Sequence, residues 1–216
     1  VRVLEALPRE GRVEAQIALI NELLARIGDA ARGVVASEDQ LAPPGRMLRA
    51  ILTSVEPPRK PTAPPYPGLP LSVSGLLVNG RHDLSIGPEL KKEIASADRV
   101  ELLCSFLKWS GFRLVQPELE ALCKRGALRV LTTAYMGATE RRALDELTKM
   151  GALLKVSYDT QRTRLHAKAW LFYRESGFST AAIGSSNLSH AALLDGVEWN
   201  VRVSQVDNGP ILEKFH

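Results

Sequence analysis

Residues 164–173, RLHAKAWLFY, form an apolar run that carries a histidine and a lysine two positions apart. The run is predicted to be a strand over 165–173, and successive side chains of a strand point to opposite faces. His166 and Lys168 are therefore expected on one face. Burying an unpaired ammonium is costly, so Lys168 needs a partner, and an anion such as a phosphate would serve.

The next segment, AAIGSSNLSH at residues 181–190, adds polar groups that suit an anion. Gly184 permits close backbone approach at the end of a predicted strand. Ser185 and Asn187 offer a hydroxyl and an amide at the expected start of a short helix, where free N–H groups favour negative charge. These features predict a phosphate site between the two segments.

Glu198 adds a carboxylate to this set. It falls on the last predicted strand, on the same face as Asn200, where it is expected to orient the His166 imidazole and raise its basicity. Each feature also has a structural interpretation, because a strand histidine is commonly a core or edge residue. Gly-Ser-Ser-Asn is likewise commonly a turn followed by a helix N-cap. The combination favours a functional site.

Strand and helix signals alternate from residue 72 onward, which predicts an α/β sandwich with a mixed, mostly parallel sheet. The predicted strands are 74–79, 99–107, 128–134, 152–159, 165–173, 179–185 and 196–204. The predicted helices are 87–97, 116–126, 139–151, 186–193 and one that begins at residue 210.

The N-terminal part differs from the rest. Residues 9–28 have apolar positions at helical spacing, and a second short helix is predicted over 43–55. Residues 56–71 are dense in proline and are interpreted as a linker. We therefore predict an N-terminal helical region over 1–55 and one α/β domain over 72–216.

Composition narrows the class of protein. The chain has 216 residues, 45% hydrophobic and 24% charged, as in an ordinary soluble globular protein. Its net charge of +4 is compatible with a polyanion such as nucleic acid. Cys104 and Cys123 lack metal-ligand spacing and are expected to be reduced core thiols of a cytoplasmic protein. No apolar run reaches the ~18–20 residues that span a bilayer.

HAKAWLF followed by GSSNLS resembles the His-Lys motif of the phospholipase D superfamily. That family's pattern is His-x-Lys, an Asp five positions after the Lys, and then Gly-Ser-x-Asn. The matching residues are His166, Lys168, Gly184, Ser185 and Asn187.

Two features depart from the family pattern. Tyr173 stands where the Asp is expected, and the interval to Gly184 is longer. The extra residues, 174–179, are predicted to form a longer hairpin turn. In the family the Asp is thought to be structural rather than catalytic, so its replacement by Tyr173 does not by itself indicate an inactive site.

The resemblance implies a phospholipase D-like α/β/α sandwich and a metal-independent phosphodiesterase that needs no cofactor. The family is taken to use two His-Lys motifs, and this chain has one, so we expect a two-fold homodimer with a composite site. There His166 forms a phosphohistidine while the second subunit's copy protonates the leaving oxygen. Lys168, Ser185 and Asn187 are expected to hold the phosphate oxygens, with Glu198 orienting the imidazole.

A narrower resemblance links four stretches to the phospholipase D-like nuclease module at the N-terminus of bacterial superfamily II (DEAD/DEAH-type) helicases. They are SFLKWSG (105–111), RTRLHAKAWLF (162–172), GFSTAAIGSSNLS (177–189) and DGVEWNVR (195–202). The likeness implies nucleic acid, most simply DNA, as substrate. The chain carries no Walker-type Gly-x-x-x-x-Gly-Lys-Ser/Thr motif, so the resemblance implies that a helicase motor lies beyond His216 in the full protein.

Cationic and aromatic residues near the motif are candidate substrate contacts. Lys108 and Trp109 follow a predicted strand, at the sheet edge where ligands gather, so Lys108 would contact substrate and Trp109 would stack a base. Arg162 and Arg164 precede the histidine strand and are expected to contact flanking phosphates. Each has an alternative as a surface residue, a core tryptophan or part of a solvated loop.

Rival functions remain open. The first is a catalytically silent module that binds DNA or dimerises a helicase, although such a module would not need His166. The second is a lipid phosphodiesterase, which should show an amphipathic membrane-binding element that the sequence lacks. The third is a structural tether in which residues 1–71 dock another protein.

Overall fold

A computed structural model describes residues 12–31, 35, 39–41, 65–80, 83–159, 161–162 and 164–215. The chain divides into two compact units, Val1–Pro61 and Thr62–His216. The predicted helix over 43–55 and most of the predicted linker over 56–71 lie outside the described residues. Among the helices of the described part, none is long and apolar enough to cross a membrane.

The first unit contains helix α2, Arg12–Ala30, close to the helix predicted over 9–28. Ile17 is buried, whereas Leu23 and Ile27 remain about half exposed. The Asn21 side chain exchanges two hydrogen bonds with the backbone of Leu41, at 2.7 and 2.8 Å, which ties the following segment to the helix.

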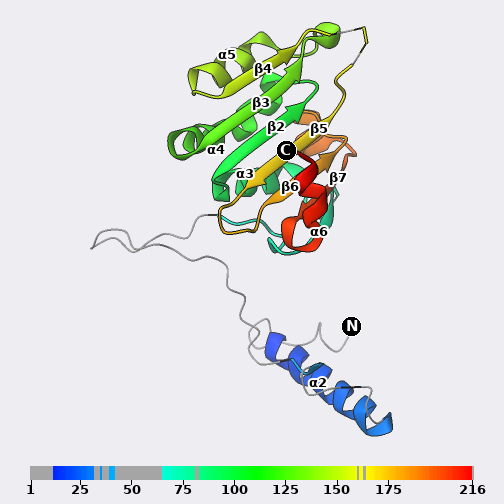
Figure 1. The fold of residues 1–216 in the computed structure, drawn as a ribbon. Coiled ribbons are helices and arrows are strands. Elements are labelled where there is room, and N and C mark those ends of the chain that lie inside the picture. The colour runs from blue at the N-terminus through cyan, green and yellow to red at the C-terminus, as the bar shows by residue number, and fades with distance from the viewer. Residues whose placement is uncertain are drawn as a thin grey trace, which may run out of the picture. The chain divides into compact units, whose positions relative to one another are not determined.

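Within the described residues, the second unit is built on a seven-stranded sheet with the order β1-β7-β6-β5-β2-β3-β4 (Figure 1). The strands are β1 Gly75–Val78, β2 Arg99–Cys104, β3 Ala127–Thr133, β4 Leu153–Ser157, β5 Lys168–Tyr173, β6 Thr180–Gly184 and β7 Trp199–Ser204.

The sheet is mixed, as predicted, but the expected predominance of parallel pairing is wrong. Strands β2, β3 and β4 pair in parallel, and the other four neighbouring pairs are antiparallel. The reason lies in the connections. Residues 174–179 join β5 to β6 directly, with Gly177 at φ 80°, and so short a connection can link only antiparallel strands.

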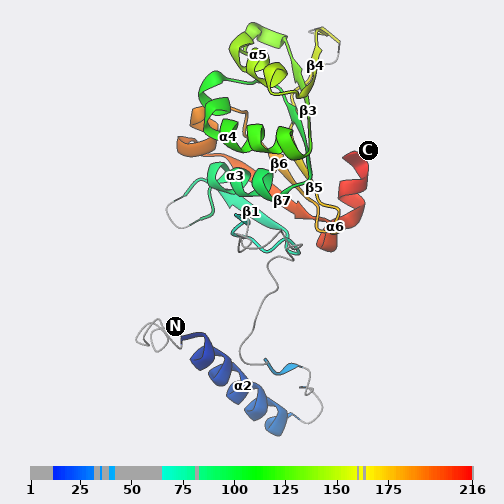
Figure 2. The same cartoon turned by 90° about the vertical axis from the view of Figure 1, so that its left-hand side faces the viewer.

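Helices cover the two faces of the sheet unequally. Helices α3 (Ile86–Ser96), α4 (Trp109–Arg125) and α5 (Arg141–Lys149) lie on one face, and α6 (Gln205–Leu212) lies on the other (Figure 2). Along β2, Val100, Leu102 and Cys104 alternate inward to the main core beneath the three helices. A smaller core under α6 includes Leu171, Val203 and others. The expected α/β/α sandwich is confirmed.

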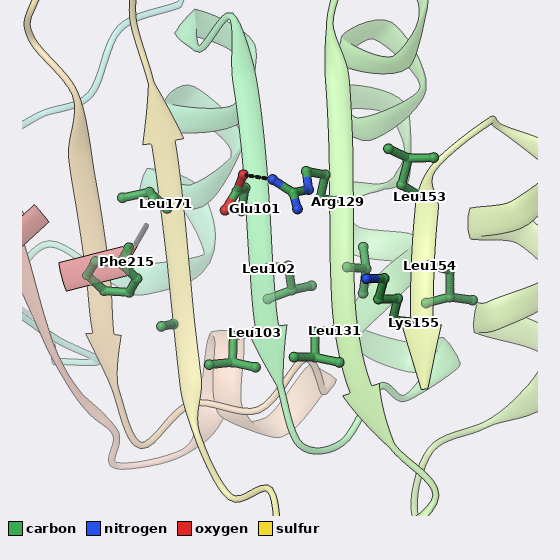
Figure 3. Close-up of a pocket in the computed structure, with 12 residues that line it drawn as sticks. Glu101, Leu102, Leu103, Arg129, Leu131, Leu153, Leu154, Lys155, Leu171 and Phe215 are labelled. Atoms are coloured by element: carbon green, nitrogen blue, oxygen red, sulfur yellow. Dashed lines mark hydrogen bonds and ion pairs between the residues drawn. The ribbon is translucent and has the colours of Figure 1, made fainter. Parts of the chain in front are cut away.

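Part of the face that carries α6 stays uncovered. A groove runs over β2, β3 and β4, where Leu131 is 40% exposed and Leu153 is 66% exposed, and Phe215 closes one side (Figure 3). Glu101 and Arg129 form an ion pair of 2.9 Å across it. The residues singled out by the sequence motif do not line this groove, so the candidate site lies elsewhere.

Several predicted boundaries are wrong near the motif. Helix α4 begins at Trp109 and not at residue 116, because Glu140 Oε2 accepts the Trp109 N–H at 2.8 Å and so caps the helix from another element. Strand β5 begins at Lys168 and not at residue 165. The helix predicted over 186–193 is a single π-helical turn, Ala191–Asp195.

Candidate active site

The His-Lys pair lies where β5 begins and β2 ends. His166 precedes the strand and is exposed, so its predicted place inside the strand is wrong. The backbone is nevertheless held in line, because Ala167 O accepts from both the N–H and the Oγ of Ser105, each at 3.1 Å. Lys168 Nζ then lies 3.2 Å from His166 Nδ1 and 3.1 Å from Nε2. The expected meeting of the two side chains is confirmed.

Lys168 is a nearly buried ammonium, 8% exposed. Its Nζ donates to the carbonyl oxygen of His166 at 2.9 Å. Burial lowers the pKa of Lys168, and the nearby Cys104 and Glu198 partly offset that effect. In the part of the chain that the structure describes, no carboxylate forms an ion pair with Lys168.

Asn187 comes to the same place from the segment after β6. The Phe106 N–H donates to Asn187 Oδ1 at 3.3 Å, and Cys104 Sγ lies 3.9 Å from the same oxygen. Since the oxygen is engaged by a donor, the Nδ2 amide is the group left to bind an anion. Phe106 also packs its ring edge-on to the His166 ring, with the centroids 6.2 Å apart.

The segment that carries Asn187 is extended rather than helical. Leu188 forms a parallel bridge with Leu107 and accepts the Lys108 N–H at 2.8 Å. The π-helical turn starts only at Ala191. The predicted helix N-terminus at Ser185 and Asn187 is therefore wrong, and no helix dipole acts there.

Gly184 and Ser185 are engaged by strand β7. A Cβ at Gly184 would collide with the carbonyl oxygen of Trp199 and with Asn200, so close strand packing already requires glycine here. Ser185 Oγ donates to Glu198 and accepts the Trp199 N–H at 3.1 Å. Glu198 precedes β7, so its predicted place in the strand is wrong. Its carboxylate bonds the Ser185 hydroxyl in place of the expected contact with the histidine ring.

The predicted flanking contacts take different positions. Lys108 Nζ is 3.6 Å from Glu140, beside the Asn187 segment. Arg164 is exposed, and its guanidinium lies 5.5 Å from the centre of the Tyr135 ring. Arg162 is exposed and donates its backbone N–H to Asp159 at 3.0 Å.

The Trp109 ring is already occupied. It stacks on Phe112 with the centroids 5.6 Å apart, the Arg142 guanidinium lies 3.8 Å from its centre, and it packs against the main core. Base stacking by Trp109 is therefore not supported, and the alternative of a core tryptophan fits.

The sequence-based prediction of the site did not include Cys104, Ser105 and Phe106, which contact the Asn187 side chain, Ala167 and the His166 ring. Cys104 was expected to be a core thiol, and it is free and buried; Cys123 is free and partly buried. Burial raises the pKa of both thiols. The one local signal was that these residues directly follow a buried strand. In the described ranges, no group of three or more His, Cys, Asp or Glu side chains could hold a metal ion.

Solved structures of other proteins share this fold. The solved structure of Nuc from Salmonella typhimurium, a phospholipase D family member, matches with a TM-score of 0.51 at 18% identity, over 66% of this chain and 88% of that one. The chain has the phospholipase D superfamily fold. NucT from Helicobacter pylori matches with a TM-score of 0.48 at 13% identity, over 66% of this chain and 92% of that one. No protein-family model and no curated protein sequence matches the chain.

The departure at Tyr173 lies outside the site of this phospholipase D fold. Tyr173 is the last residue of β5 and pairs with Arg99, whose guanidinium lies 3.8 Å from the centre of its ring. Tyr173 lies five residue steps along the strand from Lys168, about 17 Å at the usual rise per residue. The missing Asp therefore leaves the grouping of His166, Lys168 and Asn187 in place.

Proposed function

We propose that this chain is a metal-independent phosphodiesterase, a nuclease that cuts nucleic acid through a phosphohistidine intermediate. The observation that carries the proposal is the meeting of His166, Lys168 and Asn187. An exposed imidazole stands 3.1–3.2 Å from a nearly buried ammonium, beside an amide whose oxygen is already engaged. Such a set offers a nucleophile and two donors for phosphate oxygens.

The chemistry needs two imidazoles. In the first step a ring nitrogen of His166 attacks phosphorus, the N–P bond forms, and the P–O bond to the leaving oxygen breaks. A second, protonated imidazole gives its proton to that oxygen. In the second step this imidazole takes a proton from water, the water oxygen attacks phosphorus, and the N–P bond breaks. One diester and one water give a monoester and an alcohol.

Lys168 and Asn187 would hold the equatorial oxygens while charge develops on them. Lys168 has no carboxylate partner to compete with the phosphate in the described part of the chain. The Ser185 hydroxyl is hydrogen-bonded to the Glu198 carboxylate. In this state Ser185 therefore does not offer its proton to a phosphate, and Glu198 does not contact the imidazole. We propose that Ser185 reaches the phosphate when substrate draws Glu198 toward the histidine.

The second imidazole is proposed to come from a second copy of the chain. Of the other histidines, His190 is paired with Asp195 at 3.1 Å, and His82 and His216 lie outside the described residues. The chain carries one His-x-Lys. A two-fold homodimer would place two copies of His166 on opposite sides of one phosphate, as in-line displacement requires.

Subunit mixing tests the homodimer. If each site needs both copies of His166, an equal mixture of wild type and His166→Ala, exchanged to equilibrium, retains about one quarter of the wild-type activity. If each subunit acts alone, about one half remains. Sedimentation of both proteins confirms that the variant still dimerises.

We further propose that the substrate is DNA and that the chain is the nuclease module of a larger cytoplasmic helicase. Support for DNA comes from the net charge of +4 and from the exposed Arg162 and Arg164 before the motif. Support for the helicase comes from the four resembling sequence stretches. Cleavage by the natural full-length protein that ATP stimulates would support this arrangement, provided that a variant with an inactivated motor domain loses the stimulation. ATP-indifferent cleavage would oppose it.

The deciding experiment uses purified protein in EDTA with end-labelled single- and double-stranded DNA and RNA. Wild type is compared with His166→Ala and with a matched control, His190→Ala, which removes the other described histidine of this unit. Cleavage by wild type and the control alone, with an acid-labile phosphoprotein trapped on quenching, supports the proposal. Strict Mg²⁺ dependence opposes it. Binding without cleavage by wild type favours the silent DNA-binding and dimerisation module.

A further inference from the structure

The loop of residues 134–140, between β3 and α5, is pinned beside the candidate active site. Thr139 Oγ1 donates to the carbonyl oxygen of Ser105 at 3.2 Å. The same Ser105 holds Ala167, the residue between His166 and Lys168, through its N–H and its Oγ at 3.1 Å each. One residue of β2's end therefore connects the loop to the nucleophile.

Met136, at the tip of this loop, combines two unfavourable features. Among the described residues it is the one non-glycine with a positive φ, at φ 60° and ψ 9°, and it is 75% exposed. An L-residue avoids this left-handed conformation unless its surroundings impose it. Here hydrogen bonds from Tyr135 N to Thr133 Oγ1 at 3.1 Å and from Glu140 N to Leu107 O at 2.9 Å fix both sides.

The surroundings of Met136 suit a nucleic acid strand. The Tyr135 ring next to it is half-buried and lies 5.5 Å from the guanidinium of Arg164, which is two residues before His166. On the other side of the loop, the Arg141 side chain is 91% exposed. An apolar tip between an aromatic ring and cations is the arrangement with which proteins unstack bases and hold the adjoining phosphates.

We propose that Met136 is a wedge that inserts beside a base next to the scissile phosphate and unstacks it. Apolar side chains, Met among them, serve as such wedges in other DNA-binding proteins. Unstacking would bend the strand and bring its phosphate down to His166, while Arg164 holds the neighbouring phosphate. The proposal rests on the proposed nuclease function and narrows its substrate to strands whose steps unstack readily, such as pyrimidine–purine steps.

A fluorescence experiment tests the wedge without any cleavage. The probe is duplex DNA with 2-aminopurine at a central TA step, whose emission rises when the base unstacks. The protein is the 216-residue chain carrying His166→Ala, in EDTA. We expect its addition to raise the emission, and a second substitution, Met136→Gly, to abolish most of the rise. Leu153→Ala, which removes another exposed apolar side chain, from the groove over β2, β3 and β4, should leave the emission unchanged.

Two further readings make the test decisive. Glycine accepts the left-handed conformation freely, so Met136→Gly should melt at a temperature equal to or above that of its parent. Lost emission then cannot come from misfolding. With His166 intact, Met136→Gly should lower the ratio of duplex to single-strand cleavage by tenfold or more, since unstacking a step costs a few kcal/mol and each ~1.4 kcal/mol is a factor of ten. Full emission and an unchanged ratio in Met136→Gly would overturn the wedge. Absence of cleavage by wild type, with the emission still depending on Met136, would overturn the nuclease proposal alone.

Discussion

Replacing Glu93 by glutamine should destabilise the second unit more than any exposed ion-pair substitution. Glu93 lies in α3, 3% exposed, between two buried arginines. Its Oε2 accepts from Arg174 at 2.6 Å and from Thr180 Oγ1 at 2.8 Å, and its Oε1 accepts from Arg202 Nε at 2.6 Å. One carboxylate thus compensates two guanidiniums that are 7% and 1% exposed.

The expected magnitude follows from this geometry. Glutamine keeps one acceptor oxygen but turns an NH₂ group toward the other arginine, so one hydrogen bond becomes a contact between donors. Both guanidiniums remain buried without a counter-charge, because their other partners are neutral: Pro70 and Val73 carbonyls for Arg202, and Ser96 for Arg174. Breaking a buried pair from one side costs about 3–5 kcal/mol. For a unit of this size that lowers the melting temperature by about 6–20 °C.

Urea denaturation followed by circular dichroism measures the loss, and Glu101→Gln is the matched control. Glu101 pairs with Arg129 at 2.9 Å, but the Arg129 side chain is 57% exposed, so this change should cost at most about 1 kcal/mol. The reasoning is that burial makes the Glu93 cluster contribute more to stability than a surface ion pair. It would be refuted if both variants lost the same free energy of unfolding with an unchanged dependence on urea concentration.

Three further predictions concern the site. Burial lowers the pKa of Lys168, so if its ammonium binds the phosphate, kcat/KM should fall at a pH below the ordinary lysine value of 10.5, and Lys168→Arg should shift this fall upward; the pH profile of cleavage in EDTA measures it. Gly184→Ala should cost about 1–3 kcal/mol in urea denaturation, because the added methyl meets the Trp199 carbonyl. Burial raises the pKa of both thiols, but Cys104 is buried and Cys123 is partly exposed, so iodoacetamide should alkylate Cys123 first in the native protein; equal labelling in peptide mapping would contradict this.

Most strands and helices of the second unit were predictable because their signals are local. Apolar runs marked β2 and β3, and glycine after a polar stretch marked the ends of α4 and α5. The start of α4 was not predictable. Its cap is Glu140, 31 residues along the chain, and no pattern near Trp109 announces it. The antiparallel half of the sheet was missed for a similar reason, since alternation of elements says little about which strands become neighbours.

The candidate site shows the same division. The spacing of His166 and Lys168 placed both on one side of the chain, and that geometry is present although His166 precedes the strand. The orientation of Asn187 depends on Phe106, 81 residues away in sequence. Contacts of this kind arise only after the sheet has assembled, so a single sequence cannot supply them.

The two ends of the central strands treat positive charge in opposite ways. At one end Arg174 and Arg202 share the carboxylate of Glu93, and each buried guanidinium has a counter-charge within 2.6 Å. At the other end Lys168 is almost as buried, yet its hydrogen bonds go to the ring nitrogens and the carbonyl oxygen of His166. A chain that pairs its buried guanidiniums so closely in the core leaves Lys168 without an ion pair among the described residues, near the Asn187 amide. Under the proposed function, a bound phosphodiester would offset part of the free energy that desolvating Lys168 costs, because it has the charge and the oxygens to do so.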